Sequence, residues 1–187
     1  MIGRRAVLLA ALALPGCASF RDPVAGDFRV GSGFVVTLAQ DWSDFSGSRP
    51  HFVRLLSRNG IALDRLYLAR DLSGLEGLRG RVRKDAPPIH AGMSDAELSA
   101  YVAHCVDASG YTAPQITGMR PQAFGAARGL RLDLTTRTGD GLDIGGAALV
   151  IEREGKVQLI LFLAAREHYF ATLLPEVEAI MASAVLL

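Results

Sequence analysis

Few residues of this chain are arranged for chemistry. The four histidines are scattered, and none belongs to a metal-binding motif such as His-Glu-x-x-His; they are His51, His90, His104 and His168. Cys105 follows His104, but neighbours on a helix point about 100 degrees apart, so the two cannot act as nucleophile and base. A Gly-x-Ser-x-Gly elbow and a Ser-x-x-Lys pair are also absent from the sequence. The sequence therefore predicts no catalytic motif, no metal site and no cofactor.

A basic cluster is the first candidate binding feature. Arg79, Arg81, Arg83 and Lys84 lie in the glycine- and proline-rich stretch from Asp71 to Met93. Guanidinium groups bind phosphate or acidic headgroups in a bidentate manner, so this cluster could bind a ligand of that kind. The alternative is a solvated loop without a ligand. The glycines of this stretch lack the lysine of a phosphate-binding loop, and we expect a flexible loop.

The segment around Trp42 is the second candidate. Asp41, Trp42 and Asp44 follow the predicted strand Gly33–Leu38, and an aromatic ring between carboxylates could bind a sugar or a peptide. Alternatively, Trp42 closes the edge of the core. An enzymatic site could still be assembled in the fold, with His51 or His90 beside Asp41 or Asp71. An envelope hydrolase or transferase is therefore the alternative to a binding protein.

The N-terminus resembles that of bacterial lipoproteins. Arg4 and Arg5 precede nine apolar residues, too few for a membrane span, and the lipobox-like Leu14-Pro15-Gly16-Cys17 follows. The resemblance implies that residues 1–16 are a signal peptide, that Cys17 carries lipid, and that residues 17–27 form a tether. The alternative is an ordinary secreted protein with a chance cysteine. The paired arginines also leave both general secretion and twin-arginine export open.

The same resemblance predicts a location. Ala18 follows the cysteine where Asp would favour the inner membrane, so we expect an outer-membrane anchor with the protein facing the periplasm. Its partners would be the membrane itself and an envelope protein or acidic envelope component. Without the leader, 18 Lys and Arg stand against 19 Asp and Glu, a net charge of −1 that gives no attraction to nucleic acid. Cys105 is then unpaired, and its helical spacing predicts a buried position.

The remaining pattern predicts a single domain over residues 28–187. Two extended runs, His51–Ser57 and Ile61–Arg70, flank an Asn-Gly turn. The capping box at Ser94 opens a helix that stops at Gly110. Four strands then follow as an antiparallel meander, and the last of them should be central and buried on both faces; they are Gln115–Phe124, Ala127–Thr138, Leu142–Glu152 and Lys156–Ala165. Gly145-Gly146 suggests a bulge or a close backbone approach. The tail Glu167–Leu187 should be helical, with a kink or a new first turn at Pro175.

This order of elements is similar to the PsbP-like fold. The resemblance implies an α+β sandwich in which an antiparallel sheet of about six to seven strands packs with two main helices. The stretch from Leu56 to Asp64 also looks like one found in uncharacterised Gram-negative envelope lipoproteins. PsbP-like domains are mostly binding or assembly modules. The resemblance therefore implies a non-catalytic binding or assembly module.

Overall fold

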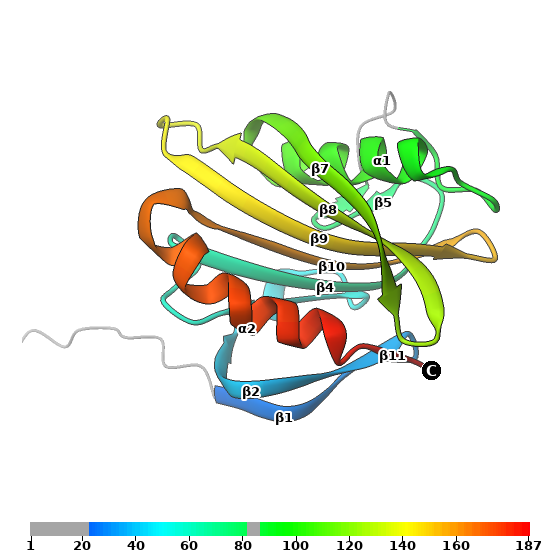
Figure 1. Cartoon of the computed structure of the whole chain (residues 1–187), viewed down its shortest axis with the longest axis horizontal. Helices are drawn as coiled ribbons and strands as arrows, with labels where there is room; N and C mark the ends of the chain where they lie inside the picture. The colour runs from blue at the N-terminus through cyan, green and yellow to red at the C-terminus, as the bar shows by residue number, and fades with distance from the viewer. Residues whose placement is uncertain (1–22, 82–86) are drawn as a thin grey trace, which may run out of the picture.

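The computed structural model describes residues 23–81 and 87–187, and its main element is a nine-stranded antiparallel sheet (Figure 1). The strand order is β1-β2-β3-β4-β10-β9-β8-β7, with β11 beside β2. The sheet strands are β1 (Pro23–Val30), β2 (Phe34–Asp44), β3 (Val53–Ser57), β4 (Asp64–Leu72), β7 (Thr112–Phe124), β8 (Ala127–Arg137), β9 (Asp143–Arg153), β10 (Lys156–Ala165) and β11 (Val185–Leu186). The helices are α1 (Asp95–Ala108), α2 (Ala171–Ala182) and the short η1 (Ser46–Ser48) and η2 (Arg166–Phe170), and a small hairpin joins β5 (Glu76–Gly77) to β6 (Gly80–Arg81).

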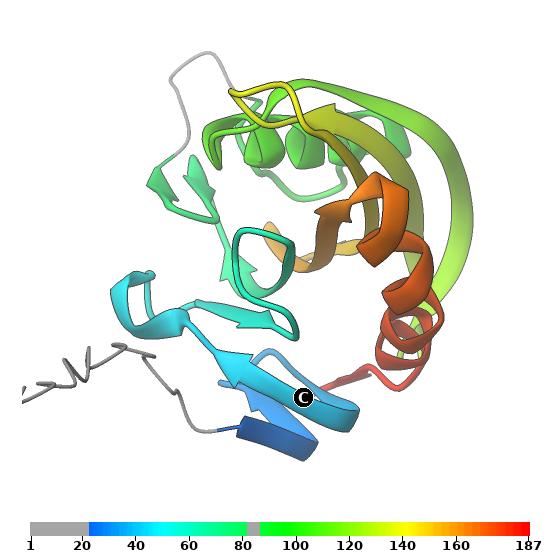
Figure 2. The same cartoon turned by 90° about the vertical axis from the view of Figure 1, so that its left-hand side faces the viewer.

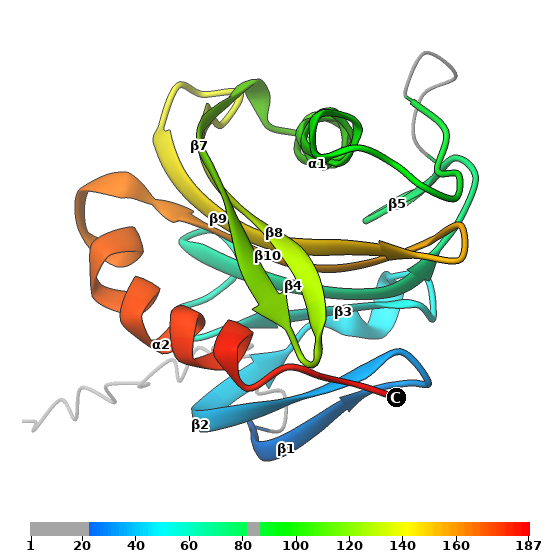
Figure 3. The same ribbon diagram turned by 45° about the vertical axis from the view of Figure 1, so that its right-hand side comes forward.

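The two long helices cover opposite faces of the sheet. Figure 3 shows α1 above the strands and α2 below them, next to β2, and Figure 2 shows how strongly the sheet curves. Each helix has its own core: Leu98 and Val102 belong to the α1 side, whereas Val177 and Ile180 belong to the α2 side. No helix in the described part of the chain is long and apolar enough to span a membrane. The PsbP-like prediction of a sheet with two helices is confirmed, but the sheet has more strands than the six to seven predicted.

Strand β10 shows why both faces must be covered. Its odd-numbered residues, such as Leu159 and Leu161, point to the α1 core, and its even-numbered residues, such as Ile160 and Phe162, point to the α2 core. It pairs with β4 on one side and with β9 on the other. The prediction of a central strand buried on both faces is confirmed. The meander from β7 to β10 is also confirmed, with bounds shifted by a few residues.

Helix α1 begins as the sequence predicts. The Ser94 hydroxyl accepts a hydrogen bond from the backbone of Glu97, and the Glu97 carboxylate accepts one from the backbone of Ser94. Cys105 is fully buried on the core side of this helix. Burial raises the pKa of its thiol to about 12, so the group stays protonated and unreactive in the folded protein.

Several predicted boundaries are wrong. The first strand begins at Pro23, inside the predicted tether, and β2 continues through Asp41 and Trp42 instead of ending at Leu38. Strands β3 and β4 pair as predicted, but their connection is longer than a tight two-residue turn. The Asp64 carboxylate organises this connection by accepting hydrogen bonds from the backbone N–H groups of Arg58 and Asn59.

The C-terminal segment is a shorter helix than predicted. A single π-helical turn, η2, precedes α2, and Pro175 is the fifth residue of α2 rather than part of its first turn. After Ala182 the chain becomes extended, and Val185 pairs with Val35 of β2. The two glycines of β9 permit the close approach that the sequence suggested, because a Cβ atom on Gly145 would lie 2.6 Å from the Phe170 ring.

Candidate functional site

The predicted basic cluster is only partly within the described residues. Arg83 and Lys84 lie outside them, as does Cys17, and Arg81 ends β6. Arg79 donates a hydrogen bond from Nη1 to the Ser109 carbonyl oxygen, 3.3 Å away, at the C-terminal end of α1. No basic residue occupies the last turn of α1 itself, so Arg79 places a positive charge where the helix dipole favours one.

The described parts of the stretch from Asp71 to Met93, residues 71–81 and 87–93, pack against the protein core. The Tyr101 hydroxyl of α1 donates to the Glu76 carbonyl oxygen at 2.7 Å, and Gly74 forms a β-bridge with Ile89. Leu78 and Ile89 are buried in the α1 core. The expectation of a flexible loop is therefore wrong for residues 71–81 and 87–93, because apolar side chains and hydrogen bonds fix them against α1.

The structure separates the residues around Trp42. Trp42 is fully buried in the α2 core, and its indole Nε1–H donates to Glu176 of α2 at 2.9 Å. Asp41 is exposed on the same strand, and Asp44 forms an ion pair with Arg54. Because a buried indole has no face left for a ligand, the interpretation of Trp42 as a binding residue is not compatible with the structure. Trp42 instead closes the core, which was the other interpretation of this segment.

The histidines do not assemble with the predicted carboxylates. His90 is paired with Glu97 at 3.2 Å, and this pair is exposed. His51 lies edge-on to Phe52, and the oxygens of Asp71 are engaged by other groups. Across residues 23–81 and 87–187, no group of three His, Cys, Asp or Glu side chains is close enough to hold a metal ion. The constellations considered for a hydrolase or transferase are thus not brought together.

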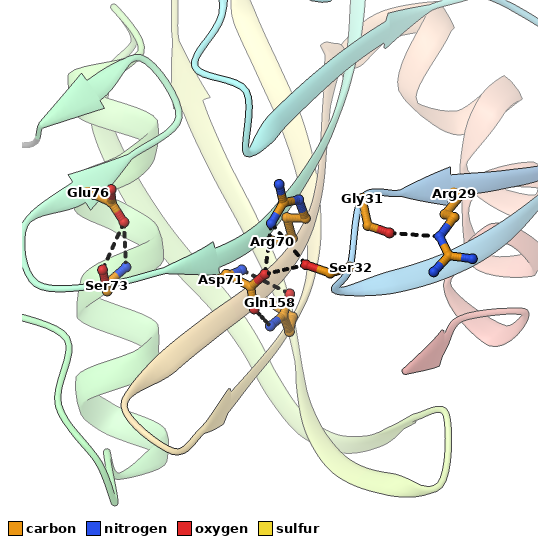
Figure 4. A network of polar contacts seen from close by, with 8 residues as sticks. All are labelled: Arg29, Gly31, Ser32, Arg70, Asp71, Ser73, Glu76 and Gln158. Atoms are coloured by element: carbon orange, nitrogen blue, oxygen red, sulfur yellow. Dashed lines mark hydrogen bonds and ion pairs between the residues drawn. The ribbon is translucent and has the colours of Figure 1, made fainter. Parts of the chain in front are cut away.

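A polar network around Asp71 joins three separate parts of the sheet (Figure 4). The carboxylate accepts hydrogen bonds from Arg70 at 2.9 Å, from Ser32 of the β1–β2 turn at 3.3 Å, and from Gln158 of β10 at 3.0 Å. Partial burial alone would raise the pKa of Asp71, but the hydrogen bonds from Gln158, Arg70 and Ser32 outweigh it and hold the pKa below its ordinary value. Gly33 allows this packing, since a Cβ atom there would lie 2.6 Å from Cβ of Arg70.

This network borders a small polar cavity of about 150 Å³. Its walls come from the β1–β2 turn, the end of β4, the β9–β10 turn and the C-terminal strand. Asp71 and Glu154 both line the cavity with a positive φ, 50° and 54°, which is uncommon for residues other than glycine. Only the identity of Asp71 was among the sequence candidates, and its partners could not be foreseen because they are distant in the sequence.

A second group of polar side chains, the Arg-Tyr cluster, lies where α1 ends. The cluster consists of Arg49, Arg65, Tyr67 and Tyr111. The Arg49 guanidinium carbon is 5.5 Å from the centre of the Tyr67 ring, and that of Arg65 is 5.3 Å from the centre of the Tyr111 ring. Both arginine charges also act on the Tyr111 phenol, which places the four side chains in one neighbourhood.

No sequence motif marks the Arg-Tyr cluster. Arg65 and Tyr67 are two residues apart on β4, so they share one face of the strand. The sequence therefore predicts that these two side chains are neighbours. Arg49 directly follows η1, and Tyr111 lies in the turn after α1, so only the fold brings them next to Tyr67 and Arg65. Arg79 contacts Ser109, and Arg65 contacts Tyr111, two residues further along the chain. Arg79 and the Arg-Tyr cluster therefore both lie at the turn that follows α1.

Comparisons with known proteins give the fold and no relative close in sequence. No protein-family model matches the chain, and no curated protein matches it. Among solved structures, the cyanobacterial PsbP protein CyanoP of Synechocystis sp. PCC 6803 is 14% identical with a TM-score of 0.56, and the match covers 95% of this chain and all of CyanoP. LpqN, which is involved in cell envelope biogenesis of Mycobacterium tuberculosis, is 15% identical with a TM-score of 0.50, covering 88% of this chain and 89% of LpqN. The chain therefore has a PsbP-like fold.

Proposed function

We propose that this protein is a non-catalytic binding module of the bacterial envelope, anchored by a lipid on Cys17. Its binding surface is formed by the end of α1, the Arg-Tyr cluster and the basic segment that begins at Arg79. The observation that carries this proposal is the Arg79–Ser109 hydrogen bond, which fixes the start of the basic segment on the core. A partner that binds at this end of α1 meets a surface that the core already holds in place, so binding there costs little chain entropy.

The position of the first strand supports the anchoring part of the proposal. Strand β1 begins at Pro23, so only residues 18–22 separate it from Cys17. Five extended residues reach at most about 18 Å. A lipid on Cys17 would therefore keep the domain close to the membrane surface, with Ala18 favouring the outer membrane and a periplasmic orientation. The structural neighbour involved in cell envelope biogenesis is compatible with this role.

The test is capture of the partner in the native envelope. Cells that produce the wild-type protein are cross-linked, and the products are identified by mass spectrometry. They are compared with cells that produce a chain in which Arg79, Arg81, Arg83 and Lys84 are all replaced by Gln. The matched control removes four charges elsewhere, at exposed arginines: Arg29, Arg128, Arg153 and Arg166. Loss of the partner in the first variant but not in the control supports the proposal, whereas equal capture by both variants contradicts it.

A Cys17→Ala chain tests the anchor in the same preparation. The mature protein should leave the membrane fraction, and the N-terminal peptide of the wild-type protein should carry acyl chains by mass spectrometry. An unmodified Cys17 peptide from membrane-bound wild-type protein would contradict lipid anchoring.

A further inference from the structure

We propose that the Arg-Tyr cluster binds a phosphoryl group, either as free phosphate or as a phosphomonoester headgroup. The inference rests on the proposed function as a binding module and adds the chemical class of the ligand. Arg49, Arg65, Tyr67 and Tyr111 would supply all the contacts. Their burial, charge and hydrogen-bonding state each point to an anion.

The two arginines carry charges that no carboxylate of residues 23–81 or 87–187 neutralises. Within the described ranges, neither Arg49 nor Arg65 forms an ion pair, whereas Arg54 and Arg58, which lie between them in the sequence, pair with Asp44 and Glu176. Arg65 uses its Nε–H to hold the Ile61 carbonyl oxygen at 2.6 Å and keeps its other donors. Both arginines are half-buried, so solvent screens their charges less than it would at an open surface.

Tyr67 adds a buried donor that has no partner among the described residues. Its ring is fully buried, and its hydroxyl forms no hydrogen bond to any residue that the structure places. Buried hydroxyl groups nearly always have partners in folded proteins. The Arg49 guanidinium lies over the Tyr67 ring, and Arg65 shares its face of β4, so the unsatisfied hydroxyl indicates a position where a ligand oxygen belongs.

Tyr111 also remains a donor at neutral pH. Burial raises the pKa of its phenol to about 12, with a smaller increase from Tyr67, although the charges of Arg65 and Arg49 oppose the shift. The cluster thus offers two cations and two phenolic O–H donors, and none of its four residues is a carboxylate. A phosphomonoester carries close to two negative charges at pH 7 and three acceptor oxygens, which matches this set better than a single carboxylate does.

The first experiment measures phosphate binding by the purified full chain. Thermal midpoints and calorimetric affinities are recorded with increasing inorganic phosphate, at constant ionic strength set with chloride. Arg49→Gln combined with Arg65→Gln should weaken phosphate binding by about 100-fold, because two charge-assisted contacts are lost. The matched control, Arg153→Gln with Arg166→Gln, removes two exposed charges and should bind like the wild type.

Tyr67→Phe separates ligand binding from folding. This variant removes only the hydroxyl group, which has no partner in the described part of the chain, so its thermal midpoint without phosphate should be unchanged or higher. Its phosphate affinity should fall by about tenfold, which corresponds to one hydrogen bond to a charged group. An unchanged phosphate affinity in Tyr67→Phe would overturn the assigned role of this residue.

A vesicle experiment distinguishes the two sources of phosphate. A Cys17→Ala chain, which cannot carry the lipid, is sedimented with vesicles of phosphatidylcholine with or without phosphatidic acid. Sedimentation that requires phosphatidic acid and is lost in the double arginine variant identifies a lipid headgroup, and phosphate binding without sedimentation identifies a soluble phosphate. The proposal is overturned if neither ligand binds, or if the double arginine variant binds both like the wild type. Partner capture that persists in that case would leave the binding module in place and exclude only this ligand class.

Discussion

Asp71 and Gln158 hold each other through two hydrogen bonds, although 87 residues separate them in the sequence. The backbone N–H of Asp71 donates to Oε1 of Gln158 at 3.1 Å, and Nε2 of Gln158 donates to Oδ1 of Asp71 at 3.0 Å. Gln158 lies on the central strand β10 and Asp71 near the end of β4, where the pairing between these strands is irregular. The same carboxylate receives Ser32 from the β1–β2 turn, so this pair ties the outer hairpin to the centre of the sheet.

The first prediction concerns this pair. In Asp71→Asn, the new asparagine tolerates the positive φ of this position, but its amide binds Arg70 and Gln158 less strongly than the carboxylate does. We expect Asp71→Asn and Gln158→Met each to lower the free energy of unfolding by about 1 to 2 kcal/mol. The double variant should lose about 1 kcal/mol less than the sum, because both changes remove the same contact. Urea denaturation of the four proteins measures this coupling, and strictly additive losses would show that the two residues act independently.

The second prediction is an acid dependence of stability. The folded pKa of Asp71 lies below its ordinary value of 3.8. The carboxylate therefore contributes stability that is present above the unfolded pKa and is lost as the pH falls through the lower folded pKa. The wild-type urea midpoint should fall more steeply with acidification below about pH 4 than that of Asp71→Asn. Parallel pH profiles for the two proteins would contradict this assignment.

The third prediction concerns Arg131 of β8, whose fully buried side chain points toward α2. It contacts Asp133 at 2.8 Å and Glu178 at 3.5 Å, while its Nε has no hydrogen-bond partner in the described part of the protein. Burial lowers the pKa of this guanidinium, although Asp133 partly offsets the effect. Replacing a buried charge by an apolar side chain of similar length is often neutral or stabilising.

We therefore expect Arg131→Met to change the free energy of unfolding by less than about 1 kcal/mol or to increase it. Asp133→Ala, which leaves the arginine with fewer partners, should cost about 2 kcal/mol. Chemical denaturation measures both variants. A larger loss in Arg131→Met than in Asp133→Ala would show that the buried charge itself stabilises the fold.

The fourth prediction uses two glycines with different surroundings. A Cβ atom at Gly145 would lie 2.6 Å from the Phe170 ring, which stacks on Phe162. Gly145→Ala should therefore lower the free energy of unfolding by about 1 to 3 kcal/mol through overpacking. Gly139 faces open space, so Gly139→Ala serves as the control and should change stability by less than about 0.5 kcal/mol. Equal thermal midpoints for the two variants would mean that η2 can move away from β9 without cost.

Local patterns predicted the elements that depend on local physics. The capping box located α1, and the continuous apolar run located β10 as the central strand. Leu130 and Leu132 alternate with Arg131, a pattern typical of a strand with one covered face, but in β8 α2 covers the other face as well and buries Arg131. That outcome depends on tertiary packing, which the alternation of side chains along one strand does not encode.

The candidate site was less predictable because its residues come together only in the fold. Arg79 was recognised as a candidate, yet its contact with Ser109 spans 30 residues. Trp42 was expected equally at a surface site or in the core, and only the position of α2 decides for the core. Arg49 and Tyr111 carry no motif at all, and their proximity follows from where η1 and the end of α1 are placed.

The most direct test of the binding surface is site-specific photo-cross-linking in living cells. A photoreactive amino acid replaces Asp107, which is exposed in the last turn of α1, or Thr172, which is exposed on α2 at the opposite face of the sheet. The proposed function predicts a partner adduct at Asp107, absent at Thr172 and lost when Arg79, Arg81, Arg83 and Lys84 are neutralised. An adduct at Thr172 alone, or one at Asp107 that survives neutralisation, would contradict the assignment of binding to the end of α1 and its basic segment.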